Sequence, residues 1–229
     1  MKFSTACKSL ALGSLMLASA NSMAAVIAST DFDGRTVSGS TASDLTWVTQ
    51  GVANPGDVSA DFALFDTAGT ANRFGVDRNL HNESSWSANV ALNVLAGNSI
   101  ALSNVSFDAF IINNAGALQT VQRNLSYTAA LLDSAMNVFS QISVNDIYGN
   151  SGSVTNGQNI MFDFSGNTLS AGNTYTLRIT ASGTGPGNNA ALDNLVINGE
   201  VTAQAVSEPS LMAIFGLGFL MVMARRFRK

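Results

Sequence analysis

Cysteine, lysine and histidine are nearly absent from this chain of 229 residues. The only cysteine is Cys7, and no lysine lies between Lys8 and Lys229. Without thiols or clustered imidazoles, the chain lacks the ligand sets that hold transition metals. A Ser-His-Asp triad would have to use His81, the only histidine, and no Gly-x-Ser-x-Gly elbow surrounds a serine. The sequence therefore favours an exposed loop histidine over a catalytic base.

Charged residues make up only 11% of the chain, and they are unevenly distributed. Residues 25–206 contain five arginines against fourteen Asp and Glu, which gives a formal charge of −9. A lysine-free acidic body offers no basic surface for phosphates, which argues against nucleic-acid binding.

The N-terminus has the three parts of a secretory signal peptide. Lys2 and Lys8 are followed by an apolar run over residues 10–18, and Ser22-Met23-Ala24 supplies small residues for cleavage. We predict residues 1–24 as a signal peptide cleaved after Ala24. A buried N-terminal helix is the alternative, which the order of these parts disfavours. Cys7 precedes the apolar run, so it is not placed to accept a lipid.

The C-terminus carries a second apolar segment, residues 211–224, which contains no charge. As a helix it spans about 21 Å, short of the roughly 30 Å hydrocarbon core of a bilayer, so it is a marginal membrane span. The basic tail that follows should stay cytoplasmic. A buried core helix is the disfavoured alternative, because four cations would end it. The tail contains Arg225, Arg226, Arg228 and Lys229.

These C-terminal residues resemble a known sorting signal, PEP-CTERM. Val206-Ser207-Glu208-Pro209-Ser210 is followed by the apolar segment and the basic tail, as in that family. Ser207 stands where the family has its first proline. The resemblance covers about the last two dozen residues, 205–229. It implies recognition by exosortase, a membrane protease of Gram-negative bacteria that secrete exopolysaccharide, and release to the cell surface or extracellular matrix after transient membrane anchoring.

Residues 25–204 form the predicted domain, and their apolar residues recur with a period of two. In 87–94, for example, Ala88, Val90 and Leu92 share one face. We predict an all-β two-sheet sandwich, most consistent with a jelly roll, and keep an immunoglobulin-like sandwich as the alternative. The predicted strands are 26–33, 45–50, 61–65, 73–77, 87–94, 100–113, 124–133, 137–144, 160–164, 174–180 and 192–202.

The first and last predicted strands resemble those of carbohydrate-binding jelly rolls, on the residues 28–34 and 191–197. The resemblance implies that the two strands pair and hold a structural calcium ion. Strand alternation places Asp193 on the face of Leu195, toward the core, and calcium takes carboxylate oxygens. Asp31, Asp33 and Asp193 are therefore candidate Ca²⁺ ligands. The alternative is that Asp193 caps a turn while the other two aspartates are solvated.

Glycan binding is the other function that the sequence suggests for the domain. A sugar ring stacks on an exposed aromatic side chain flanked by polar groups. Trp86 and Tyr148 lie beside polar loops and are candidate platforms, with core packing as an equal alternative; Trp47 is assigned to the core. The sequence favours a structural or glycan-binding protein without enzymatic activity. A secreted glycan hydrolase or lyase is the alternative, disfavoured because Glu83 and Glu200 are the only glutamates in the domain.

Overall fold

The computed structural model describes residues 24–66, 72–80, 84–119, 124–148, 156–184 and 189–203. These ranges contain fourteen strands and no helix. None of their segments is therefore a helix long and apolar enough to cross a membrane. The predicted signal peptide, sorting motif, membrane segment and basic tail lie outside the described residues, as do His81 and Glu83.

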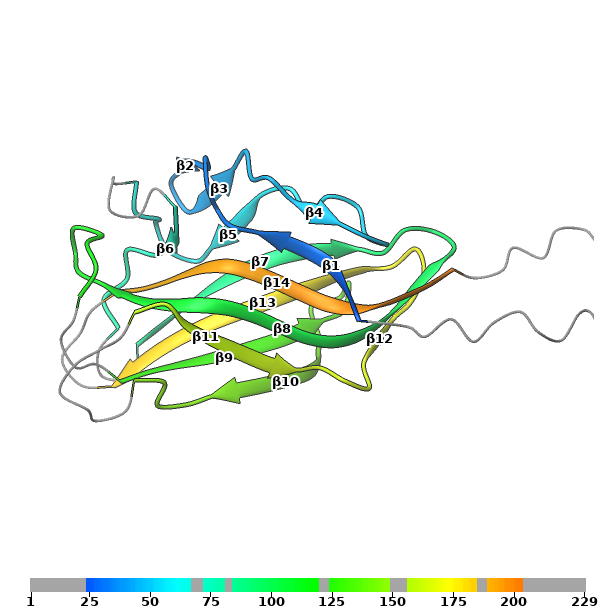
Figure 1. Cartoon of the computed structure of the whole chain (residues 1–229). Helices are drawn as coiled ribbons and strands as arrows, with labels where there is room; N and C mark the ends of the chain where they lie inside the picture. Colours follow the sequence, from blue (N-terminus) through cyan, green and yellow to red (C-terminus); the bar gives the residue numbers. More distant parts are fainter. Residues whose placement is uncertain are drawn as a thin grey trace, which may run out of the picture.

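The strands form two sheets that stack as a sandwich (Figure 1). Sheet A has the order β11 (Gln158–Asp163), β8 (Asn98–Ile112), β14 (Asn189–Ala203), β1 (Ala25–Thr30) and β4 (Val48–Thr49), with β12 (Thr168–Leu169) beside β8 and β6 (Phe74–Gly75) beside β14. Sheet B has the order β10 (Val138–Val144), β9 (Asn124–Leu132), β13 (Thr174–Thr184), β7 (Ser85–Asn93), β5 (Val58–Ala60), β3 (Thr41–Ser43) and β2 (Thr36–Ser38).

Eight of these strands are six residues or longer, and their pairing defines a jelly roll. The first pairs with the last (β1 with β14), the second with the seventh (β7 with β13), the third with the sixth (β8 with β11) and the fourth with the fifth (β9 with β10), all antiparallel. The chain is thus a long hairpin wrapped into two sheets. This confirms the predicted jelly roll and the pairing of the terminal strands, and it excludes the immunoglobulin-like alternative.

The core lies between the sheets and follows the predicted alternation. Along β7, every second side chain from Trp86 to Leu92 is buried, while the residues between them are only partly so. Six aromatic rings form a continuous line through the core, with neighbouring centroids 5.1–6.5 Å apart. In order of contact they are Phe32, Phe74, Trp86, Tyr127, Phe107 and Phe162.

Two predicted strands are largely lost in the structure, and a third, predicted at 73–77, is shortened to Phe74–Gly75. Residues 61–65 form no strand, and only Leu64 bridges to Val76. The strand predicted at 45–50 is reduced to Val48–Thr49. Both segments have apolar side chains that pack against the margin of the core from loops. Their hydrophobicity therefore reflects burial, and not the hydrogen bonding of a regular strand.

Candidate functional site

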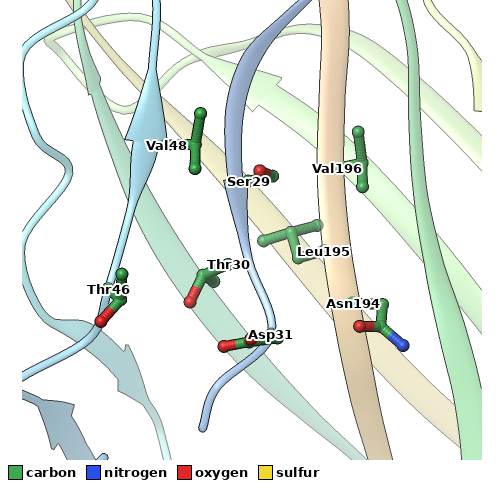
Figure 2. A pocket seen from close by; sticks show the side chains of 8 residues that line it. All are labelled: Ser29, Thr30, Asp31, Thr46, Val48, Asn194, Leu195 and Val196. Atoms are coloured by element: carbon green, nitrogen blue, oxygen red, sulfur yellow. The ribbon is translucent and has the colours of Figure 1, made fainter.

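A pocket of about 210 Å³ opens on the outer face of sheet A, where β1 lies between β14 and β4 (Figure 2). Three separate chain segments line it: the end of β1, the residues around β4, and the middle of β14. The lining residues are Ser29, Thr30, Asp31, Thr46, Val48, Asn194, Leu195 and Val196.

Strand register builds the apolar part of this pocket. Ser29 of β1 pairs with Val196 of β14 on one side and with Val48 of β4 on the other. Cross-strand partners have their side chains on the same face of a sheet. Figure 2 shows Val48, Ser29 and Val196 in a row across the three strands. Val48 is 62% exposed, so this row presents hydrocarbon to solvent beside a small hydroxyl.

Polar side chains gather at the other end of the pocket, where β1 ends. Figure 2 shows Asp31, Thr46 and Asn194 around this end. The Asp31 Oδ1 accepts a hydrogen bond from the Asp33 backbone N–H at 3.1 Å, which fixes the carboxylate in a tight turn. A carboxylate, an amide and hydroxyls thus lie around this end of the pocket, next to an apolar row.

Two residues flanking this polar end adopt left-handed backbone conformations. Phe32 has a φ of 57° and Asn194 a φ of 50°. A left-handed conformation is unusual for a phenylalanine and costs about 1–3 kcal/mol, whereas asparagine tolerates it. The Phe32 ring is anchored in the core at 1% exposure, so packing holds the strained turn that positions Asp31. Such strain is concentrated at functional sites in proteins.

A β-bulge at Asn194 corrects the predicted orientation of Asp193. Leu192 pairs with Ala109 and Asp193 with Asp108, but the next paired residue is Val196, opposite Ser106. The extra residue shifts the alternation. Asp193 therefore lies on the outer face of sheet A with Asp108, while Leu195 points to the core. The prediction that Asp193 faces the core is wrong for this reason.

Asp193 and Asp108 belong to a charged cluster beside the pocket. The Asn194 Nδ2 donates to the Asp108 Oδ2 at 2.8 Å, and the Asn159 Nδ2 donates to the Asp108 Oδ1 at 3.1 Å. Partial burial raises the pKa of Asp193 to about 6. The Asn194 N–H and Arg73 lower that pKa, whereas Asp33 and Asp108 raise it further.

Arginines surround the carboxylates of this cluster. The Arg35 Nη2 donates to the Phe65 carbonyl at 3.1 Å, and burial lowers the pKa of Arg35 against the opposing effect of Asp66 and Asp193. The Arg73 guanidinium lies 4.6 Å from the Phe110 ring centroid, at cation–π distance. The cluster thus balances partly buried carboxylates with partly buried guanidinium groups.

The three predicted calcium ligands are not assembled together. Asp33 lies close enough to Asp193 to affect its pKa, but Asp31 is turned to the pocket and to the Asp33 backbone. In the described ranges, no three Asp, Glu, His or Cys side chains gather in a group that could hold a metal ion. Neighbouring guanidinium charge also disfavours a cation. The described side chains therefore do not fit the predicted Ca²⁺ site.

The two predicted aromatic platforms are in the core. Trp86 is 0% exposed and packs edge-on against Tyr127, and Tyr148 is 4% exposed. The Tyr148 hydroxyl donates to the Ala109 carbonyl at 2.7 Å, and burial raises its pKa well above the ordinary value. Neither ring presents a face to solvent, so the core-packing alternative holds for both. Trp47 is only partly buried, and its Nε1 donates to the Gly56 carbonyl at 2.9 Å.

Phe139 is an exposed aromatic residue that the sequence analysis did not single out. It is 44% exposed at the start of β10 and contacts the Tyr175 ring edge-on, with centroids 5.8 Å apart. A bulge between Val138 and Ser140 shifts its alternation. The sequence gives little indication that Phe139 is exposed, because residues 137–144 have the pattern of an ordinary strand.

A scan against known protein families finds no match to this chain, and a search of curated proteins finds no similar sequence. Solved structures show a distant likeness. TmCBM61 in complex with β-1,4-galactotriose is 12% identical, with a TM-score of 0.32 over 76% of this chain and 90% of that chain. A family 11 carbohydrate-binding module from Clostridium thermocellum, in complex with a β-1,3-1,4-mixed-linked tetrasaccharide, is 11% identical, with a TM-score of 0.33 over 76% and 96%.

A third solved structure, arabinose-bound MgGH51 α-L-arabinofuranosidase, is 11% identical, with a TM-score of 0.38 over 76% of this chain and 27% of that chain. At these TM-scores the similarities carry no argument about function. The fold assignment rests on the strand pairing, and the functional argument rests on the pocket.

Proposed function

We propose that this protein is an exported glycan-binding protein, and that the pocket on sheet A holds one sugar unit of a polysaccharide. The observation that carries the proposal is that Asp31, Thr46 and Asn194 line the pocket beside the apolar row of Val48 and Val196. A sugar has hydroxyls around its rim and hydrocarbon on its faces, so it needs this combination of groups. A volume of about 210 Å³ suits a single ring rather than a large ligand.

The charge of the domain selects the class of glycan. A formal charge of −9 over residues 25–206 repels uronic acids and sulfated sugars. Among the residues that the structure describes, Asp31 is the only charged side chain lining the pocket, and it accepts hydrogen bonds from hydroxyls. The ligand is therefore a neutral polysaccharide, and its binding should change little with ionic strength.

The test is affinity electrophoresis of the full chain through gels containing neutral β-glucan, galactan, xylan or arabinan, with anionic alginate as a comparison. Retardation by at least one neutral polysaccharide and by no anionic one is expected. Asp31→Asn keeps the shape of the turn and should weaken retention about tenfold, because a hydrogen bond to a charged group is worth more than one to a neutral group. Thr46→Ala should weaken it less.

Thr176→Ala is the matched control for Thr46→Ala. Thr176 lies on β13 of sheet B, away from the pocket, and its hydroxyl contacts the Met136 sulfur at 3.9 Å. This variant should be retained like the wild type. Equal losses in Thr46→Ala and Thr176→Ala, or no retention by any neutral polysaccharide, would contradict glycan binding in the pocket.

A second candidate, a glycan-active enzyme, is favoured by one observation. Asp108 and Asp193 lie directly opposite each other on neighbouring strands, and partial burial raises the pKa of Asp193 to about 6. A pair of carboxyl groups of which one has a raised pKa is the machinery of glycoside hydrolysis. Release of reducing ends from a retained polysaccharide, lost in Asp193→Asn, would establish this activity; retention without release supports binding alone.

The proposal includes export and sorting, which the terminal residues suggest. The order of Lys2, Lys8, the apolar run and Ala24 supports signal-peptide cleavage, and Glu208-Pro209 with the basic tail supports processing by an exosortase. The mature protein should begin at Ala25 and lack residues 225–229. Mass spectrometry of protein released from the cell surface tests both cleavages. An intact tail on released material would exclude the sorting mechanism without affecting the glycan site.

A further inference from the structure

The strand orders of the two sheets end in four edge strands, β11, β4, β10 and β2, and three of them are protected against pairing with another chain. β6 and β12, which also lie at the edges of sheet A, have only two residues each. β2 has three residues and β4 has two, which is too short to template a partner. β11 has six residues but ends in Asp163, an exposed carboxylate. Short length and charge are the usual devices that keep sheet edges from associating.

The fourth edge strand, β10, has little of this protection. It is seven residues long, Val138–Val144, and its sequence VFSQISV contains no charge, proline or glycine. It pairs with β9 on one side, and no described strand pairs with its other side. Its bulge lies between Val138 and Ser140, so the stretch from Ser140 to Val144 is a regular strand, and no part of the chain that the structure describes pairs with its second edge.

The core is also incompletely covered along β10. Ile142 and Val144 point inward and pack against the core, yet both are only partly buried because the sheet ends there. In Figure 1, β10 lies along the margin of the sandwich. Another strand added beside β10 would cover these side chains and pair the backbone groups that face away from β9.

We infer that β10 is a self-association edge, and that its partner is β10 of a second copy of this chain, paired antiparallel to continue sheet B across the dimer. The inference does not depend on glycan binding. An isologous contact needs a self-complementary patch. With the two-fold axis at Ile142, Gln141 faces Ser143 of the second copy and Ser140 faces Val144. None of these cross-strand pairs places two charges together or a charge against an apolar side chain.

Charge explains why the contact would form at this strand. The domain is strongly acidic, so two copies repel each other wherever carboxylates meet. β10 is an uncharged strip, with Asp133 and Asp146 beyond its two ends. An antiparallel dimer brings these flanking acids together, so salt should strengthen the association by screening them.

Cross-linking of single-cysteine variants tests this inference. The chain has one cysteine, so the full chain carrying Cys7→Ser provides a cysteine-free background. Gln141→Cys places a thiol on the exposed side of β10, and Ser59→Cys places one on the exposed side of β5, away from the edge. A short bismaleimide should yield several-fold more dimer with Gln141→Cys, and more at high salt than at low salt.

Charged variants provide the second arm of the experiment. Adding Ser143→Asp or Ser143→Lys to Gln141→Cys sets like charges near the two-fold axis, and either change should abolish the cross-linked dimer. Because residue 143 is exposed, thermal melting should show that the fold is kept. Equal cross-linking through residues 59 and 141, no cross-linking through residue 141, or persistence of the dimer with both charged variants would overturn the inference.

Discussion

Asp193 lies half-buried on the outer face of sheet A, opposite Asp108 and within electrostatic range of Asp33 and Arg73. The sequence pattern Leu192-Asp193-Asn194-Leu195 places a carboxylate in an otherwise apolar strand, which is why the sequence singles out Asp193 as a candidate functional residue. The face it occupies depends on one inserted residue, Asn194. A bulge depends on the pairing partner as well as on its own strand, so alternation along a single strand could not predict the outward orientation.

The raised pKa of Asp193 gives a prediction at the residue scale. Between the unfolded pKa, about 3.8, and the folded value, about 6, the folded state binds more protons than the unfolded state. Stability from this group therefore falls as pH rises through that window. Asp193→Asn should be more stable than the wild type at pH 7, by about 1–2 kcal/mol after discounting for solvent screening, and the difference should shrink toward pH 4.

Urea unfolding of both proteins at several pH values measures this difference. Asp163→Asn is the control, because hydrogen bonds from Ser165 lower the pKa of Asp163 and give it the opposite pH trend. A difference between Asp193→Asn and the wild type that is constant from pH 4 to pH 7 would show that burial does not raise the Asp193 pKa.

A second residue-scale prediction concerns Tyr148, whose buried hydroxyl donates to the Ala109 carbonyl. Tyr148→Phe should lower the free energy of unfolding by about 1 kcal/mol, because the carbonyl keeps its bond from the Gly157 N–H at 2.9 Å. Glycan retention should be unchanged, since the ring is in the core. Selective loss of glycan retention in a variant with normal melting would restore Tyr148 as a binding residue.

At the scale of elements, β8 and β14 form the longest antiparallel pair, and the middle of β14 lines the pocket. Gly199 of β14 lies at a second register shift, between Asn198 and Gly199. A Cβ at this position would lie 2.6 Å from the Ala101 carbonyl oxygen of β8 and 3.2 Å from Ile27. The Ala101 carbonyl belongs to the backbone, which cannot move aside as a flexible side chain can. The close approach of the two strands therefore requires glycine at position 199.

Gly199→Ala should therefore destabilise the fold by roughly 1–3 kcal/mol, the usual cost of overpacking. Thermal melting measures the loss. Thr202→Ala, at an exposed position on the same strand, is the control and should lie within about 0.5 kcal/mol of the wild type. If Gly199→Ala melted like Thr202→Ala, the close contact between β8 and β14 would not limit this position.

The sequence predicted the long strands best. Alternation in 87–94 and 174–180 identifies β7 and β13 because both are buried on one face only. The short strands β2, β3, β5 and β12 have two or three residues, which is too few to show an alternation of apolar and polar residues. Residues 61–65 gave the opposite error: a strand was predicted where the structure has a loop, because apolar side chains of this loop pack against the core.

At the scale of the whole molecule, the jelly roll brings together segments that are far apart in the sequence. The pocket combines residues 29–31, 46, 48 and 194–196, which meet only because β1 pairs with both β14 and β4. The sequence singled out Asp31 at this place, through its resemblance to the first strand of a carbohydrate-binding jelly roll. It could not predict Thr46, Val48 or Asn194, because these residues are brought together by the register between strands that are distant in the sequence.

Hydroxyl-radical footprinting of the full chain tests the central claim most directly, with an oligosaccharide of the neutral polysaccharide that retains the protein. Val48 and Val196 should be protected when the sugar is bound, because they line the pocket. Phe139 and Met136, exposed at the end of sheet B, should be oxidised equally with and without sugar. Protection of Phe139 and Met136 with unchanged oxidation of Val48 and Val196 would contradict the account and move glycan binding to sheet B.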